Sequence, residues 1–218
     1  MNAAEFTALV ESLVRDDEDR LSATDIATAV SEAIARYSTD SPQELIVDVV
    51  ADTTSTLPLP AGWQTGFSEP RRIEYPIGQT PPSYFGATSY IAYRGPSNAE
   101  NIKFNIASVT VGQSARVTFT ATHPDASTFH RGDTELVASY AAALLCEQLA
   151  AFYGHDTDST LSSDSVDHND KGRGFAIRAK SLRARYVGRF KPRSSTNSAS
   201  AFAISTQTNA RGGSRLFH

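Results

Sequence analysis

The chain has 218 residues, of which 40% are hydrophobic, and it contains 20 Lys and Arg, 24 Asp and Glu, and one Cys. This composition provides enough apolar side chains for one domain with an insertion or for two small domains, and it excludes a disordered or collagen-like polymer. A single cysteine, Cys146, cannot form an intrachain disulfide or a thiolate metal cage, so we expect folding in a reducing compartment. The first 20 residues lack a basic region followed by an apolar core, so no secretory signal is expected.

The net charge of −4 conceals a strong asymmetry along the chain. Residues 1–170 contain all 24 acidic residues and 9 basic ones, whereas residues 171–218 contain the other 11 basic residues and no acidic one. This split favours a partner for the basic end, either a nucleic acid, an acidic protein surface, or the acidic body of a second copy. The simpler alternative is a solvated basic tail with no fixed partner.

Two helices are predicted near the start of the chain. The first covers residues 3–14, and its apolar face consists of Phe6, Leu9, Val10 and Leu13. The second begins after Ser22, which forms a capping-box pattern with Asp25, and ends before Pro42. Its apolar face consists of Ile26, Val30, Ile34 and Tyr37.

From residue 44 to about 131 the pattern changes to short runs of β-branched and aromatic residues separated by Pro and Gly. The candidate strands are residues 45–50, 72–75, 89–93, 102–106 and 116–122. We interpret this region as an antiparallel β insertion.

Two further helices are predicted after the β insertion. Residues 133–153 form a helix with Asp133 as N-cap and Gly154 at C′, and its apolar composition indicates cover on both sides by other helices and a neighbouring subunit. Glu147 and Gln148 interrupt it, which argues against a membrane span. The last helix, residues 175–190, has one face of Phe175, Ala179, Leu182, Tyr186 and Phe190, flanked by Arg178, Arg185 and Arg189.

Together these elements predict an α+β fold with a small helical bundle built from both chain ends, residues 1–43 and 132–190, and a β insertion at 44–131. Residues 191–218 form an extended C-terminal arm rich in Ser, Thr, Asn, Ala and Gly. This composition cannot fold by itself, so we expect the arm to be disordered in free subunits and ordered on a partner. Its expected anchors are Phe202, Ile204, Leu216 and Phe217.

No catalytic residue or cofactor site is predicted, because G-x-S-x-G, P-loop, G-x-G-x-x-G and H-E-x-x-H motifs are absent. Residues 155–170 contain two His and five Asp, but their spacing does not match an EF-hand, and such residues often cap helices and form turns. We therefore expect no metal there and keep a metal-dependent enzyme as an alternative that a chelator would inactivate. Cys146 is interpreted as a small apolar residue, and His123 and His130 as structural loop histidines.

Three segments, residues 13–42, 59–78 and 135–186, resemble the head-tail connector, or adaptor, proteins of tailed bacteriophages. The likeness covers residues 9 to about 190 and includes the tract SDSVDHNDKGRGFAIRA at 163–179. It implies a non-enzymatic virion protein at the neck, assembled in the host cytoplasm as a ring, usually of twelve copies. Such a ring docks beneath the portal protein, extends the channel for genomic DNA without sequence-specific binding, and joins a downstream neck or tail protein. No membrane is involved.

The resemblance and the charge pattern together predict the residues that contact the portal or another partner. They are Arg178, Arg185, Arg189, Lys191, Arg193, Phe202, Ile204, Arg211, Arg215, Leu216 and Phe217. One alternative is a nucleic-acid-binding protein that uses the basic segment on phosphates and loses affinity steeply as salt rises. Another is a different neck protein, such as a stopper or a tail terminator.

Overall fold

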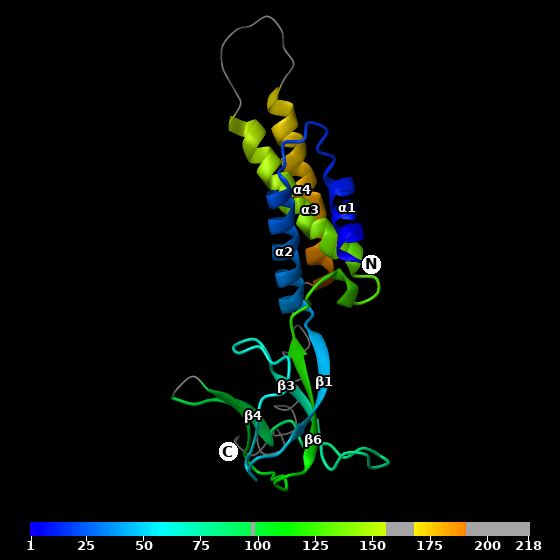
Figure 1. Ribbon diagram of the computed structural model, residues 1–218. Helices are drawn as coiled ribbons and strands as arrows, with labels where there is room; N and C mark the ends of the chain where they lie inside the picture. The colour runs from blue at the N-terminus through cyan, green and yellow to red at the C-terminus, as the bar shows by residue number, and fades with distance from the viewer. Residues whose placement is uncertain (97–98, 156–167, 191–218) are drawn as a thin grey trace, which may run out of the picture. The chain divides into compact units, whose positions relative to one another are not determined.

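A computed structural model of the chain describes residues 1–96, 99–155 and 168–190 (Figure 1). Within these residues it contains four α-helices and two three-stranded antiparallel sheets, so the predicted α+β class is confirmed. Residues 1–186 form one compact unit, and residues 187–218 form a second, of which only the helical residues 187–190 are described. The predicted arm at 191–218 therefore lies outside the described residues.

The first two helices, α1 (Ala3–Val14) and α2 (Ala23–Asp40), form where the sequence predicts them, and the capping box at the start of α2 is confirmed. The buried face of α2 shares only Tyr37 with the predicted one. It consists of Ala29, Ala33 and Tyr37, whereas Ile26, Val30 and Ile34 are only half-buried. Small alanines allow α2 to pack closely on the helix beneath it, which leaves the larger side chains at the surface.

That underlying helix, α3 (Thr134–His155), contacts both α1 and α2. Residues on several of its sides are buried, including Ala141–Ala143, Cys146 and Leu149, so the expected cover on more than one side is confirmed. The predicted end at Gly154 is wrong, because the helix continues to His155. By length and composition α3 could cross a membrane, but 56% of its most apolar window is buried within the protein, as in the core helix of a bundle.

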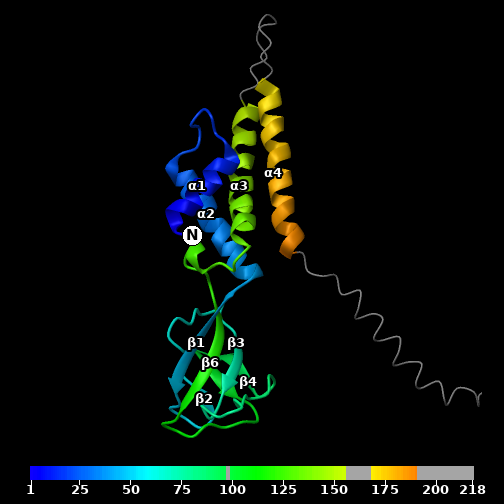
Figure 2. The ribbon, with the colours of Figure 1, turned by 90° about the vertical axis from the view of Figure 1, so that its right-hand side faces the viewer.

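The last helix, α4 (His168–Phe190), begins earlier than the predicted Phe175. Gly172 and Gly174 weaken the helical pattern there, since glycine has a low helix propensity. A Cβ at Gly172 would lie 3.3 Å from the Ala150 carbonyl oxygen and 3.4 Å from the Gly154 nitrogen, so this glycine lets α4 approach the α3 backbone. Figure 2 shows α3 between α2 and α4.

The β region consists of two sheets. The first has the order β1-β6-β3, with bounds Gln43–Val50, Ser114–Ala121 and Pro70–Glu74. The second has the order β2-β5-β4, with bounds Thr56–Leu57, Glu100–Phe104 and Tyr90–Arg94. The five predicted strands are present with ends shifted by one or two residues, and β2 was not predicted because two residues are too short to show a period.

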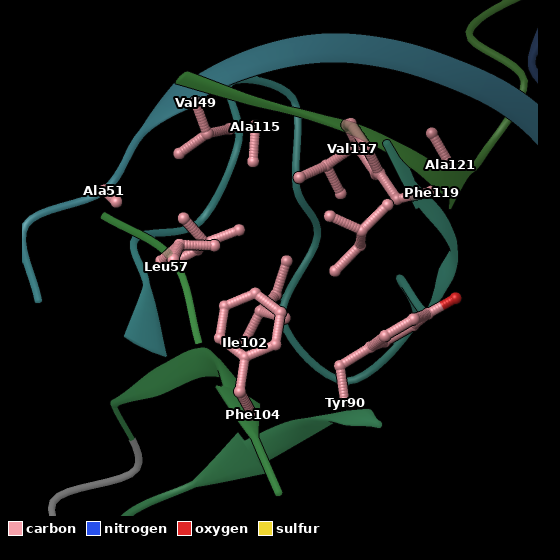
Figure 3. Packing of buried hydrophobic residues seen from close by; sticks show 12 residues of the cluster. Val49, Ala51, Leu57, Tyr90, Ile102, Phe104, Ala115, Val117, Phe119 and Ala121 are labelled. Atoms are coloured by element: carbon pink, nitrogen blue, oxygen red, sulfur yellow. The ribbon is translucent and has the colours of Figure 1, made fainter. Parts of the chain in front are cut away.

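One apolar core fills the space between the two sheets (Figure 3). Val117 and Phe119 of β6 face Ile102 and Phe104 of β5, and all four are buried. Burial alternates along β1, as expected for a strand covered on one face, whereas in the central strand β6 Thr118 and Thr120 are buried as well. This core is separate from the one that α3 forms with the other helices.

An aromatic cluster lies where the chain passes between the helices and the sheets. The rings of His123 and Phe129 both lie 4.8 Å from the ring of Tyr37, measured between centroids. His123 Nε2 lies 2.9 Å from the Ser41 carbonyl oxygen, and Nδ1 lies 3.0 Å from Thr128 Oγ1. Burial lowers the pKa of His123, so the ring is neutral at pH 7. Both ring nitrogens are engaged, which is consistent with the structural role predicted for this histidine.

Candidate assembly interface

The inner face of α4 attaches it to α3 through aromatic pairs. The ring centroids of Tyr186 and Tyr140 lie 4.8 Å apart, and those of Phe175 and Tyr153 lie 5.7 Å apart in nearly parallel planes. Leu182 is buried between them along the helix. The apolar face predicted for the last helix therefore holds it against the bundle.

Three polar contacts add to this attachment: Lys171 Nζ to Glu18 Oε1 at 2.5 Å, Arg183 Nη2 to Glu147 Oε2 at 2.8 Å, and Tyr186 Oη to Asp40 Oδ2 at 2.8 Å. The hydrogen bond from Lys171 is the main cause that lowers the pKa of Glu18 to about 2. Burial raises the pKa of Tyr186, so its hydroxyl stays protonated and donates a hydrogen bond to Asp40. Exposed ion pairs contribute only ~0–1 kcal/mol each, so the buried face provides most of the attachment.

The outer face of α4 is exposed and basic. Arg173, Lys180 and Arg185 are exposed, and none of them forms an ion pair with a residue that the structure describes. Ile177 lies among them with 61% of its surface exposed. Such a surface combines an apolar side chain with unpaired cations, which suits an acidic protein partner or a phosphate backbone.

Arg178, Arg185 and Arg189 are the predicted contact residues that fall within the described chain. Their spacing places them within about 40° of one another around α4, but Arg185 and Arg189 are exposed whereas Arg178 is half-buried. The guanidinium of Arg189 also lies 5.9 Å from the centroid of the Phe190 ring. The other predicted contact residues lie outside the described residues: Lys191, Arg193, Phe202, Ile204, Arg211, Arg215, Leu216 and Phe217.

Acidic residues dominate the α1–α2 side of the bundle. Residues 1–41 contain nine acidic and three basic residues. Part of the acidic run is used within the chain, because Asp16 accepts a hydrogen bond from the Leu21 amide and Glu18 pairs with Lys171. Within the described part of the chain, no ion pair engages Glu11, Asp17 or Asp19. The α1–α2 helices therefore carry acids, and α4 carries exposed cations, that pair with no described residue, and Figure 2 shows these helices flanking α3.

The α1–α2 side also contains an apolar groove of about 670 Å³, formed by α1, α2 and residues 122–124. Ile26, Val30 and Ile34 line it from α2. Sequence reasoning missed this groove because it assigned these three residues to the buried face. The missed signal was the pair of small residues Ala29 and Ala33 beside Tyr37, since they let that side of α2 pack closely on α3.

The enzymatic alternatives gain no support from the described residues. Among them, no group of three or more His, Cys, Asp or Glu could hold a metal ion, and the side chains of the 155–170 stretch lie outside the described set. Cys146 is fully buried, and this burial raises the pKa of its thiol to about 11. The thiol therefore stays protonated and is not a nucleophile.

No protein-family model and no curated protein matches the chain, whereas several solved chains from gene transfer agent (GTA) particles are similar to it. One, from the neck of the native particle computed with C12 symmetry, is 16% identical over 80% of this chain and 92% of that chain, with a TM-score of 0.28. Another, from the neck of the empty particle computed with C6 symmetry, is 15% identical over 80% and 88%, with a TM-score of 0.26. These neighbours are neck components of phage-like particles, but at TM-scores this low the likeness supports no argument about this chain.

Proposed function

We propose that the chain is a structural subunit of a phage-like neck, namely a head-tail adaptor that forms a ring beneath the portal and joins the capsid to the tail. The observation that carries this proposal is that one subunit presents two surfaces of opposite charge: α1–α2 carries acids such as Glu11, and α4 carries exposed cations such as Arg185, and neither pairs with a described residue. Complementary faces on opposite sides of one subunit generate a ring when the rotation closes. The sequence resemblance to adaptor proteins favours the closed ring over a filament.

The purified full-length chain, with and without its portal protein, tests this proposal. Native mass spectrometry and negative-stain images should show rings, most simply of twelve copies, seated on the portal around an open channel. In infected cells, the protein should be recovered in virions at the capsid-tail junction. A chain that stays monomeric with and without the portal would contradict the proposal. A ring found below the adaptor position would assign it to the stopper or terminator class.

DNA binding is the second candidate function, because the exposed cations Arg173, Lys180 and Arg185 suit phosphates. For an adaptor we expect weak binding to free duplex DNA, since the acidic body opposes the approach of a polyanion. Fluorescence anisotropy with a short duplex at several salt concentrations separates the two functions. Tight binding that weakens steeply with salt would favour the nucleic-acid-binding protein.

A further inference from the structure

We propose that the apolar groove between α1 and α2 is the seat for the outer face of α4 from a second copy of the chain. This inference deepens the proposed function and rests on it, because it names the contact by which subunits join. It concerns the groove of about 670 Å³ described above and the exposed surface around Ile177.

The groove has the chemistry of a helix-binding site. Ile26, Val30 and Ile34 of α2 and Pro124 of the following link give it an apolar lining. Glu11 is the single carboxylate among the lining residues, and the lining His123 is neutral because burial lowers its pKa. A groove of this kind accepts a helix that presents one apolar ridge with charges at its sides.

The outer face of α4 presents such a ridge. Ile177 is 61% exposed; the small Gly174, Ser181 and Ala184 lie beside it on one side at helical spacing, and the long Arg173 and Lys180 lie on the other. Small neighbours allow a helix to lie close to a shallow surface, so Ile177 can reach the groove. Lys180 flanks this ridge and forms no ion pair with a described residue of its own chain.

Charge favours α4 of a second copy as the occupant of the groove over the α1–α2 groove surface of that copy. One end of the groove continues into a hollow of about 430 Å³ that shares Glu11 and Ile26 and also contains Asp17, Asp19 and Arg15. These acids complement the cations of α4, and opposite charges orient an encounter. Two α1–α2 surfaces placed face to face would instead bring like charges together, which disfavours a back-to-back dimer.

The arrangement also leaves each subunit able to bind two neighbours. No residue of α4 lines the groove, so filling the groove of one copy leaves its own α4 free. Each copy thus contributes one groove and one helix, and the contact repeats head to tail around a ring. A symmetric dimer would use the same surface on both copies and would stop there.

Cross-linking between single-cysteine chains tests the contact directly. In a Cys146→Ala background, one sample carries Ala27→Cys in the groove and the other carries Ile177→Cys on α4. A short bis-maleimide should link the two only when they are mixed. Linked dimers from the Ala27→Cys sample alone would show facing grooves and overturn the proposal.

Two surface variants measure the same contact without a linker. Ala27→Trp fills the groove and Ile177→Asp places a charge on the ridge, and each should weaken self-association by at least about tenfold. Thr28→Trp is the matched control, because Thr28 is exposed on α2 outside the groove and bonds only within its own helix. All three variants should melt like the wild type.

The outcomes separate this contact from the proposed function. Rings on the portal that tolerate both variants and show no mixed cross-link would overturn the contact and leave the adaptor function intact. A chain that never assembles, even with the portal, would contradict the adaptor function itself. A mixed cross-link in a protein that does not bind the portal would retain the contact but assign it to another assembly.

Discussion

The two long C-terminal helices, α3 and α4, differ in how much of their surface the protein covers. α3 is buried on most of its sides, as the fully buried Ala141, Ala142 and Ala143 show, although Glu147, Gln148 and Phe152 are exposed toward its end. α4 is buried along one face only, and its opposite face is exposed and basic, with Ile177 as an exposed apolar side chain. A largely covered helix leaves little surface for a partner, so we assign stability to α3 and the proposed contact surface to α4.

Placing the same charge on each helix tests the difference in burial between α3 and α4 most directly. Ala142→Glu buries an unpaired carboxylate in α3, which should cost at least about 4 kcal/mol and prevent folding or assembly. Ile177→Glu places the carboxylate on the exposed face of α4 and should leave the melting temperature nearly unchanged. Circular dichroism melts check both. Normal folding of the Ala142→Glu variant would show that α3 is not enclosed.

The attachment of α4 to α3 should depend mainly on Tyr186, which is 1% exposed. Tyr186→Ala removes a buried aromatic ring and should cost about 3–5 kcal/mol. Tyr186→Phe keeps the ring and removes the hydroxyl that bonds to Asp40, so it should cost about 1 kcal/mol. Urea unfolding measures both, and limited proteolysis should cut α4 first in the alanine variant. Equal losses for the two variants would assign the attachment to the hydroxyl instead of the ring.

Local signals allowed much of the fold to be predicted from the sequence. The start of α2 follows from the capping box of Ser22 and Asp25, which involves residues three apart. The strands followed from alternation, with errors of one or two residues at their ends. The face that α2 buries could not be predicted in full, because it depends on packing against α3. This packing buries Ala29 and Ala33 and leaves Val30 half-buried. The early start of α4 depends on Gly172 meeting the α3 backbone, which is also a tertiary contact.

The candidate interface was predictable to a lesser degree. Spacing alone placed Arg178, Arg185 and Arg189 on one side of a helix, but their exposure depends on the neighbouring helices. The pairing of Glu18 with Lys171 joins residues far apart in the chain, so it removes one acid and one cation from the free charges in a way that no local pattern shows. The portal contacts predicted for the arm stay predictions.

Acid should weaken the contact that holds the first turns of α4. The pKa of Glu18 is about 2 in the folded chain, below its ordinary value of 4.5, so its ion pair with Lys171 stabilises the fold above about pH 4.5. This contribution should disappear as the pH falls from 4.5 toward 2. Melting temperatures of the wild type and Glu18→Gln should differ slightly at pH 6 and converge near pH 2. Glu11→Gln, which removes a carboxylate without a described ion pair, should show no such convergence.

The smallest effect on stability is expected from removing the arm. Ordering the backbone costs about 1–2 kcal/mol per residue, and residues 191–218 contain only four large apolar side chains to offset it, Phe202, Ile204, Leu216 and Phe217. A chain truncated after Phe190 should therefore melt like the wild type, because α4 keeps its buried face, yet fail to remain on capsids. Differential scanning calorimetry and capsid co-sedimentation check the two halves of this prediction. If the truncation unfolds the bundle, the arm belongs to the fold, and if the truncated chain still joins heads to tails, the contact with the portal lies on α4 or elsewhere in residues 1–190.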